Sequence, residues 1–468
     1  MRSFVTKWGL LAAGSLLAVA QPSMAQEAFS TLDRTPEARI SFSAAERGVP
    51  IQAGSTVTVA GEGFEPGQQV TLLYGAAALP GGPLTADAEG KITGTIAIPA
   101  SAVSGNHPIV AVTAAPYAAL VSDLKVSPTV PLSGQDGYTV TQAQSARGIY
   151  QTAYSAKSGA IFVTTSVGRP PVTQSELLKM DPDTLAVVAR VTPGAAPAQA
   201  PRPGQQARDP GVFAVYGVGV DDATDTVWVT NTRQNTIAVY RQSDLSLVKQ
   251  FPPESVTHPR DVKIVGGKAY VSATNTPDVA VFDTATLEPV APISISSSMR
   301  GKEFGTASLS ADTANNKLYV VSMGSGEVAV IDTTSDTVEK VISVPGVRGA
   351  IGVSHDPASG RIYVAAQGTD NLVVLDGTSG AVIADTPVGA GALNVAFDPT
   401  HQLAYVSSRG AGTITVTDAD GAIVANLGPA QMANHVALGA DGVVYASVKS
   451  ASARDEEGDT VMRIVPNG

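Results

Sequence analysis

The sequence predicts an all-β protein with two domains, and two observations carry this prediction. Charged residues make up only 15% of the chain and 46 residues are glycine, which suits short strands joined by tight turns. A unit also recurs along most of the chain, most clearly at Leu318–Gly346, where the apolar runs Leu318–Ser322 and Val328–Ile331 flank a Gly-Ser-Gly turn. With a further strand at Thr306–Ser310, one copy forms a four-stranded antiparallel sheet. Its two apolar faces have to be covered by neighbouring copies.

The N-terminus has the pattern of a secretory signal peptide. Arg2 and Lys7 precede the apolar run Trp8–Ala20, and small residues stand at the positions that a signal peptidase reads, up to Ala25. We expect residues 1–25 to be removed and the mature protein to be periplasmic or secreted. The apolar run is shorter than the roughly 20 residues that a membrane span needs, so we expect no transmembrane segment.

Charge and cysteine content narrow the function classes. The formal net charge of −11 argues against a general nucleic-acid binder, while it leaves room for a local basic pocket. The absence of cysteine excludes disulfides, thiolate metal sites and c-type haem attachment.

Residues 36–128 predict a small β-sandwich, with residues 129–135 as the linker that follows. Turn clusters such as Gly61-Glu62-Gly63 separate the strand-like runs. The segment Val59–Val70 resembles the immunoglobulin-like (Ig-like) modules of bacterial exported proteins, although the Cys and Trp of antibody domains are missing. We interpret the domain as a spacer or docking module, with a ligand site as the alternative. The strand-like runs are Arg39–Phe42, Ser55–Ala60, Gln69–Tyr74, Lys91–Ile98, Pro108–Thr113 and Leu120–Val126.

Residues 136–468 predict a seven-bladed β-propeller. An aromatic residue in the second strand of each copy recurs with gaps of 66, 42, 49, 44, 42 and 40 residues, close to one four-stranded blade each apart from the first. In five copies an Asp follows the third strand, where we expect it to cap a turn. The last copy has only three strands, so we expect Tyr138–Gln142 to close the ring as the outermost strand of the seventh blade. The aromatic landmarks are Phe162, Trp228, Tyr270, Tyr319, Tyr363, Tyr405 and Tyr445.

A family resemblance rests on these repeats. Val227–Asn231, Leu318–Gly346 and Arg361–Asp376 resemble the YVTN-repeat β-propellers, in particular a single exported propeller of the YncE type. The resemblance covers about residues 137–466 and implies the fold. It implies no single activity, because the family includes cell-surface proteins, and its relatives include lactonases and the haem d1 domain of nitrite reductase.

The long insertions should gather on one face of the propeller. They fall in the loops between second and third strands or between blades, which share a face, and long loops on a rigid scaffold usually serve recognition. The opposite turns stay short. The long loops are Ser166–Ser175, Pro193–Pro210, Ser296–Glu303 and Ser450–Asp459.

Basic residues are expected at the mouth of the central channel on this face. Counting fifteen residues back from the landmark aromatics places Arg147 and Arg348 at one equivalent position. His258 joins them once the shorter turn of the third copy is allowed for, and Arg260 follows it by two residues. Side chains of one parity on neighbouring strands can converge.

Two amides and a histidine extend the set. Asn394 and Asn434 share one parity in their copies, and His435 is adjacent to Asn434. Arginine forks and amides around a rim suit a carboxylate, phosphate or sugar-like ligand. The alternative is that the arginines bond to carbonyl groups of adjacent blades. Further cations on the same-face loops, expected to be solvated, are Arg169, Arg233, Arg409, Lys449 and Arg454.

Motifs for chemistry are missing. The chain has no zinc-protease helix, hydrolase elbow, phosphate-binding loop or dinucleotide fingerprint. His258 and His435 are too few for a metal site, although an axial haem ligand is an alternative for either. We therefore assign no catalytic residue, no cofactor and no metal.

Three functions follow from these observations. The leading hypothesis is an exported binding protein that uses the loop-rich face and channel mouth for a small anionic molecule or a protein partner. The alternatives are a propeller enzyme such as a lactonase and a structural cell-surface protein tethered by its first domain. The sequence gives no basis for an oligomeric state.

Overall fold

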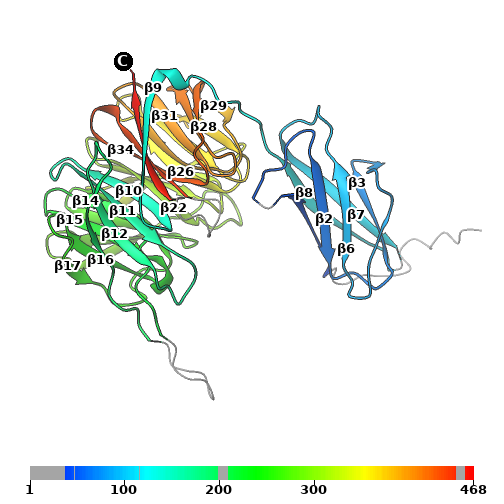
Figure 1. Ribbon diagram of the computed structural model, residues 1–468, viewed down its shortest axis with the longest axis horizontal. Coiled ribbons are helices and arrows are strands. Elements are labelled where there is room, and N and C mark those ends of the chain that lie inside the picture. The colour runs from blue at the N-terminus through cyan, green and yellow to red at the C-terminus, as the bar shows by residue number, and fades with distance from the viewer. Residues whose placement is uncertain (1–36, 47, 115, 199–208, 450–458, 468) are drawn as a thin grey trace, which may run out of the picture.

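The computed structural model describes residues 37–46, 48–114, 116–198, 209–449 and 459–467, so the predicted signal peptide lies outside the described residues. Figure 1 shows a ring of sheets beside a smaller sandwich, joined by an extended segment. Within these ranges every regular element is a strand except three short 3-10 turns, η1 (Gln135–Gly137), η2 (Thr232–Gln234) and η3 (Ala440–Gly442). No helix in the described ranges is long and apolar enough to cross a membrane.

The N-terminal domain is a sandwich of two antiparallel sheets. Residues of its strands alternate between buried and exposed, as in β2 with buried Val57 and Val59, so each sheet turns one apolar face to the shared core. One sheet has the order β1 (Arg39–Ala44), β2 (Thr56–Glu62), β6 (Ile92–Ala97). The other has the order β4 (Ala77–Ala78), β3 (Gln69–Tyr74), β7 (Gly105–Ala114), β8 (Ala118–Val126), with β5 (Leu84–Thr85) also paired to β3.

The rest of the chain forms seven four-stranded sheets, the predicted blades. Blade 1 is β10 (Ile149–Ser155), β11 (Ala160–Ser166), β12 (Ser175–Met180), β13 (Val187–Val191), and blade 2 is β14 (Val218–Asp221), β15 (Thr226–Asn231), β16 (Thr236–Arg241), β17 (Leu247–Gln250). Blade 3 is β18 (Pro259–Val265), β19 (Lys268–Ala273), β20 (Asp278–Asp283), β21 (Pro289–Ser294), and blade 4 is β22 (Thr306–Asp312), β23 (Lys317–Ser322), β24 (Glu327–Asp332), β25 (Thr337–Ser343). Blade 5 is β26 (Ala350–His355), β27 (Arg361–Ala366), β28 (Asn371–Asp376), β29 (Val382–Pro387), and blade 6 is β30 (Ala392–Asp398), β31 (Leu403–Ser408), β32 (Thr413–Asp418), β33 (Ile423–Leu427). Blade 7 is β34 (Ala433–Leu438), β35 (Val444–Val448), β36 (Thr460–Pro466) and β9 (Tyr138–Gln144).

The ring closes as the sequence predicts. β9 pairs antiparallel with β36, from Tyr138 opposite Pro466 to Gln144 opposite Thr460, and so supplies the fourth strand of blade 7. The first strand of each blade packs beside the first strand of the next, and β34 packs beside β10. The apolar faces of the sheets are therefore covered on both sides, and the seven landmark aromatics are buried between blades.

The aspartates after the third strands cap turns. In blade 4, Oδ1 of Asp332 accepts the backbone N–H groups of Thr334 and Ser335 at 2.8 and 3.0 Å. Asp376 does the same in blade 5 with Thr378 and Ser379 at 3.0 and 2.7 Å. The structural role predicted for these carboxylates is confirmed.

The segment between the domains lies along blade 6. Ser133 and Asn426 exchange backbone hydrogen bonds of 3.1 and 2.9 Å, and the Asn426 amide donates to the carbonyl oxygen of Val130 at 2.9 Å. This segment is therefore fastened to the edge of β33, which places the N-terminal domain next to the loop-rich face of the propeller.

Candidate functional site

The first strands of all seven blades surround a channel. A cavity of about 380 Å³ occupies the half of the channel toward the ends of these strands, away from the long loops. Its polar lining includes Asp261, Lys263, Asn394 and His435.

We define an interblade belt as Gln151, Asp261, Asn394 and His435, which lie beside the channel in blades 1, 3, 6 and 7. Each of these residues lies in or directly after the bulge of a first strand and accepts a backbone N–H from the next blade. In blade 2 the equivalent residue is Gly217, because the backbone of blade 3 comes closer there. A Cβ on Gly217 would lie 2.2 Å from the carbonyl oxygen of Arg260. The four bonds are Val218 N to Gln151 Oε1 (3.1 Å), Leu309 N to Asp261 Oδ2 (3.0 Å), Val436 N to Asn394 Oδ1 (3.0 Å) and Thr152 N to His435 Nδ1 (3.4 Å).

Three predicted site residues therefore bind blades together. Asn394 and His435 belong to the interblade belt, and the Asn434 amide donates to the carbonyl oxygen of Tyr150 at 2.9 Å. Burial, with the nearby positive charges of Lys263 and Arg260, holds the pKa of His435 well below its usual value. A neutral ring is what an Nδ1 acceptor requires.

Two register predictions were wrong by one residue. In blade 5 the landmark Tyr363 pairs with Ser354, and in blade 3 the landmark Tyr270 pairs with Lys263 across a turn that is two residues shorter. Counted back from these pairs, the residue of blade 3 that is equivalent to Arg147 and Arg348 is Thr257. His258 instead stands at the following position, with φ +42°, where Gly349 has φ +58°. Likewise His435, and not Asn434, is equivalent to Asn394, because the turn that follows β34 is one residue shorter.

Arg147 and Arg348 are equivalent, as predicted, yet they have different surroundings. Arg348 forms an ion pair with Asp123 of the N-terminal domain. Arg147 lines a separate hollow of about 320 Å³ on blade 1, together with Thr165 and Glu176. The expected convergence of the two guanidinium groups on one ligand is absent from the described contacts.

A different group of residues gathers at the loop-side end of the channel. The rings of Tyr150 and Tyr216, from blades 1 and 2, meet edge to face with centroids 4.7 Å apart. Lys449 Nζ lies 4.8 Å from the centre of the Tyr150 ring, and Arg233 Nε donates to the Tyr216 hydroxyl at 3.3 Å. Two cations from blades 7 and 2 thus flank an aromatic pair.

Three further side chains, Arg260, His258 and Arg409, lie near this aromatic pair and its two cations. Arg260 is half-buried, and its Nε is buried without a hydrogen-bond partner among the described residues. Burial, then the charges of Arg233 and Arg260, lower the pKa of His258. Burial and the charge of Arg409 lower the pKa of Lys449 to about 8, against the opposing effect of Asp459. We call Tyr150, Tyr216, Arg233, Arg260, Arg409 and Lys449 the basic mouth.

The sequence prediction found Arg260 and missed the other members of the basic mouth as a group. Arg233, Arg409 and Lys449 were recognised as loop cations but were expected to be solvated singly. Tyr150 and Tyr216 lie near the starts of the first strands of blades 1 and 2. These aromatic residues at equivalent strand starts were the sequence signal that could have predicted the basic mouth. Among the described residues, no three His, Asp or Glu side chains are placed to hold a metal ion.

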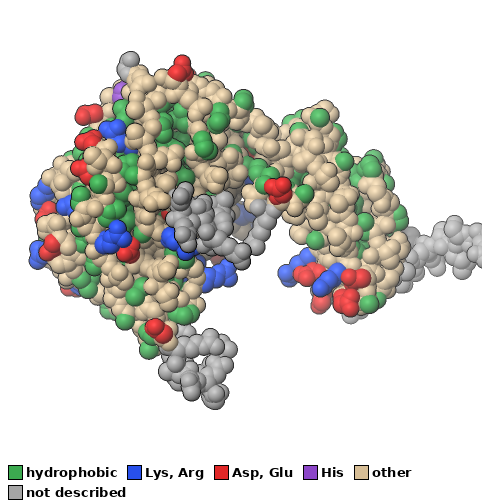
Figure 2. Space-filling view, in the orientation of Figure 1, with side chains coloured by type: hydrophobic (Ala, Val, Ile, Leu, Met, Phe, Trp, Pro, Cys, Tyr) green, Lys and Arg blue, Asp and Glu red, His purple; other side chains and the backbone are tan. Residues whose placement is uncertain are grey.

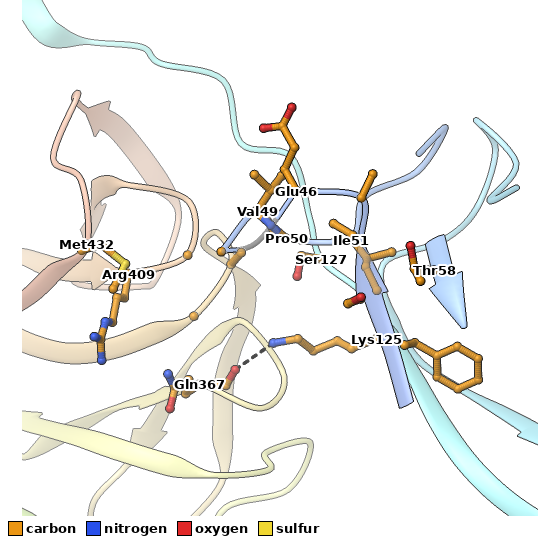
Figure 3. Close-up of a pocket in the computed structure, with 18 of the residues that line it drawn as sticks. Glu46, Val49, Pro50, Ile51, Thr58, Lys125, Ser127, Gln367, Arg409 and Met432 are labelled. Atoms are coloured by element: carbon orange, nitrogen blue, oxygen red, sulfur yellow. Dashed lines mark hydrogen bonds between the residues drawn. The ribbon is translucent and has the colours of Figure 1, made fainter. Parts of the chain in front are cut away.

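A cleft of about 770 Å³ separates the N-terminal domain from the propeller and adjoins the basic mouth. Figure 3 shows Val49, Pro50 and Ile51 on one side of the cleft and Arg409 with Met432 on the other. Lys125 reaches across, and its ammonium donates to the carbonyl oxygen of Gln367 at 3.0 Å. In Figure 2, several Lys and Arg side chains lie on the part of the propeller that faces the N-terminal domain.

Comparisons with known proteins show the fold. No family model and no curated protein matches the chain. Hydrazine synthase of Kuenenia stuttgartiensis is 18% identical, with a TM-score of 0.55 over 68% of this chain and 96% of that chain. The WD40 repeats of RRP9 are 10% identical, with a TM-score of 0.54 over 72% of this chain and all (100%) of that chain. A streptogramin B lyase is 13% identical, with a TM-score of 0.53 over 72% and 100%. These propellers include a set of WD40 repeats as well as enzymes, so the likeness establishes the architecture and transfers neither ligand nor reaction.

Proposed function

We propose that this chain is an exported propeller protein that binds a small anionic ligand, a carboxylate or a phosphate, at the basic mouth. The observation that carries the proposal is the half-buried Arg260 guanidinium, whose Nε is buried and has no hydrogen-bond partner among the described residues. A buried donor without a partner is costly, and an anionic oxygen would satisfy it.

The charge around Arg260 supports the same proposal. Arg233, Lys449 and Arg409 approach the mouth from blades 2, 7 and 6. The repulsion of Lys449 by Arg409 exceeds its attraction to Asp459, and a bound anion would relieve that repulsion. Guanidinium forks match the two oxygens of a carboxylate or phosphate, whereas a water molecule offers only one.

The scaffold is suited to this role. Tyr150 and Tyr216 support two of the cations and present a rigid wall, while the interblade belt fixes the strands that carry Tyr150 and Arg260. The mouth is therefore preorganised, which lowers the entropic cost of binding. The signal-peptide pattern supports a periplasmic or secreted location, and the repeat pattern supports membership of the exported YVTN-repeat propellers; both are parts of this proposal.

Calorimetric titration with citrate and with inorganic phosphate tests the function. We expect saturable binding that weakens with added salt, and a loss of at least about tenfold in affinity for Arg260→Ala with Lys449→Ala, because each charge-assisted hydrogen bond contributes about 1.5–3 kcal/mol. Lys157→Ala is the matched control, since this exposed lysine lies in the turn after β10 on the opposite face and pairs with Asp225 at 3.7 Å. Absence of binding by the wild-type protein, or unchanged affinity in the double variant, would refute the proposal.

A further inference from the structure

The interdomain cleft and the basic mouth are parts of one surface. Gly391 and Met432, which line the cleft, directly precede the first strands β30 and β34 that run into the channel. Arg409 also lines the cleft, and its charge acts on Lys449 at the mouth. If the anionic end of a ligand binds at the mouth, the rest of the ligand therefore extends into the cleft.

The far wall of the cleft, which the N-terminal domain forms, carries an apolar patch made by Phe42, Val49, Pro50 and Ile51. The polar side chains of Ser43, Glu46, Thr58 and Ser127 surround this patch. Val49 leaves 49% of its surface exposed, although it lies within a concave site between two domains. Exposed apolar groups in a concave site favour burial by an apolar part of a ligand.

The charges in the cleft are distributed unevenly. Arg409 lies on the propeller side of the cleft, and Lys125, which reaches across from the N-terminal domain, is already paired with Asp370 at 2.9 Å. Asp123 is occupied by Arg348, and Glu46 stands beside Val49 on the N-terminal side (Figure 3). An anionic group is therefore favoured on the propeller side and an apolar group on the N-terminal side.

We propose that the ligand is an anionic amphiphile with a single alkyl chain, its head group at the basic mouth and its chain in the interdomain cleft. This inference rests on the proposed function, because the head group occupies the same mouth. A cleft of about 770 Å³ accommodates a chain of medium length together with part of the head group. The N-terminal domain then acts as half of the binding site and not only as a spacer.

Titration with acetate, butanoate and octanoate at constant pH tests the chain. A fully buried methylene tightens binding by up to about fourfold, so partial burial of four additional methylenes predicts a Kd for octanoate at least about tenfold below that for butanoate. In Val49→Asp we expect this difference to fall to about twofold, because a carboxylate now stands at the apolar wall. Val49 is half-exposed and outside the domain core, so the substitution should leave folding intact, which the melting temperature checks.

Val188→Asp provides the matched control. Val188 is likewise exposed, at 58%, on the outer strand of blade 1 and does not line the cleft. The control should retain the full preference for octanoate. Equal Kd values for butanoate and octanoate in the wild-type protein, or a chain-length preference that survives Val49→Asp, would overturn the amphiphile proposal. The proposal that citrate or phosphate binds at the basic mouth would then still stand. If instead Arg260→Ala left the affinity for octanoate unchanged, the role of the basic mouth would be refuted and the role of the cleft would stand.

Discussion

The ammonium of Lys125 lies 2.9 Å from Oδ1 of Asp370, and this ion pair joins the N-terminal domain to the propeller. The two partners differ in burial, since the Lys125 side chain is 34% exposed and that of Asp370 only 1%. Oδ1 of Asp370 also accepts the N–H of Gly391 at 2.6 Å, while Oδ2 is buried without a partner among the described residues. The carboxylate therefore depends on a lysine from the other domain.

Lys125→Met should destabilise the protein by about 2 kcal/mol, because it leaves a buried carboxylate without its counter-ion. Adding Asp370→Asn should restore part of this loss, since the amide oxygen still accepts from Gly391 and carries no charge. Urea denaturation of both variants measures the change. Lys157→Met, which removes an exposed ion pair, should cost less than about 1 kcal/mol; equal losses at the two sites would contradict a special role for Lys125.

Ring closure predicts a sharp difference between two truncated chains. A chain that begins at residue 131 lacks the N-terminal domain and retains β9, whereas one that begins at residue 145 lacks both. The first should unfold cooperatively. The second should melt at lower temperature and over a broader range, because β36 then becomes an unpaired edge. Calorimetry compares them, and coincident transitions would show that β9 is dispensable.

The fold could be predicted further than the site. Strands, turns and blades are specified by residues close together in the chain. The last copy has only three strands in sequence, and the strand Tyr138–Gln142 before the first copy has no partner of its own, so pairing these two was the one way to close the ring. The site residues were predicted by counting back from the landmark aromatics across turns whose lengths differ between blades. The predicted positions of His258 and Asn434 were therefore wrong by one residue. The contact of Lys449 with Tyr150 joins the last blade to the first, and no local pattern encodes it.

The interblade belt predicts a measurable cost for losing one acceptor. Asn394→Ala leaves the buried N–H of Val436 without its partner, so we expect a loss of about 1–3 kcal/mol in the free energy of unfolding. Asn394→Asp should cost less, since Asp261 accepts in the same way at the equivalent position of blade 3. Thr141→Ala on the exposed β9 is the control. Similar losses for all three variants in urea denaturation would show that the hydrogen bond contributes little.

His435 predicts that acid weakens the fold. Its folded pKa is lowered, so below about pH 6.5 the unfolded chain takes up a proton that the native protein does not, and stability falls by up to about 1.4 kcal/mol per pH unit. Above that pH the histidine adds no pH dependence. His435→Gln should flatten the slope between about pH 6.5 and 5, because Gln151 accepts in the same way at the equivalent position. Urea midpoints across this range measure the slope, and an unchanged slope in the variant would rule out His435 as its source.

Lys449 predicts that anion affinity falls on the alkaline side of neutrality. Burial and Arg409 lower its pKa to about 8, so the ammonium is mostly charged at pH 7 and mostly neutral at pH 9. Citrate becomes slightly more negative over this interval, which by itself would tighten binding, and His258, with its lowered pKa, is mostly neutral throughout it. The Kd for citrate should therefore rise severalfold between pH 7 and pH 9 in the wild-type protein. Lys449→Arg keeps a full charge and should bind equally well at both values; a parallel loss of affinity in this variant would assign the titration to another group.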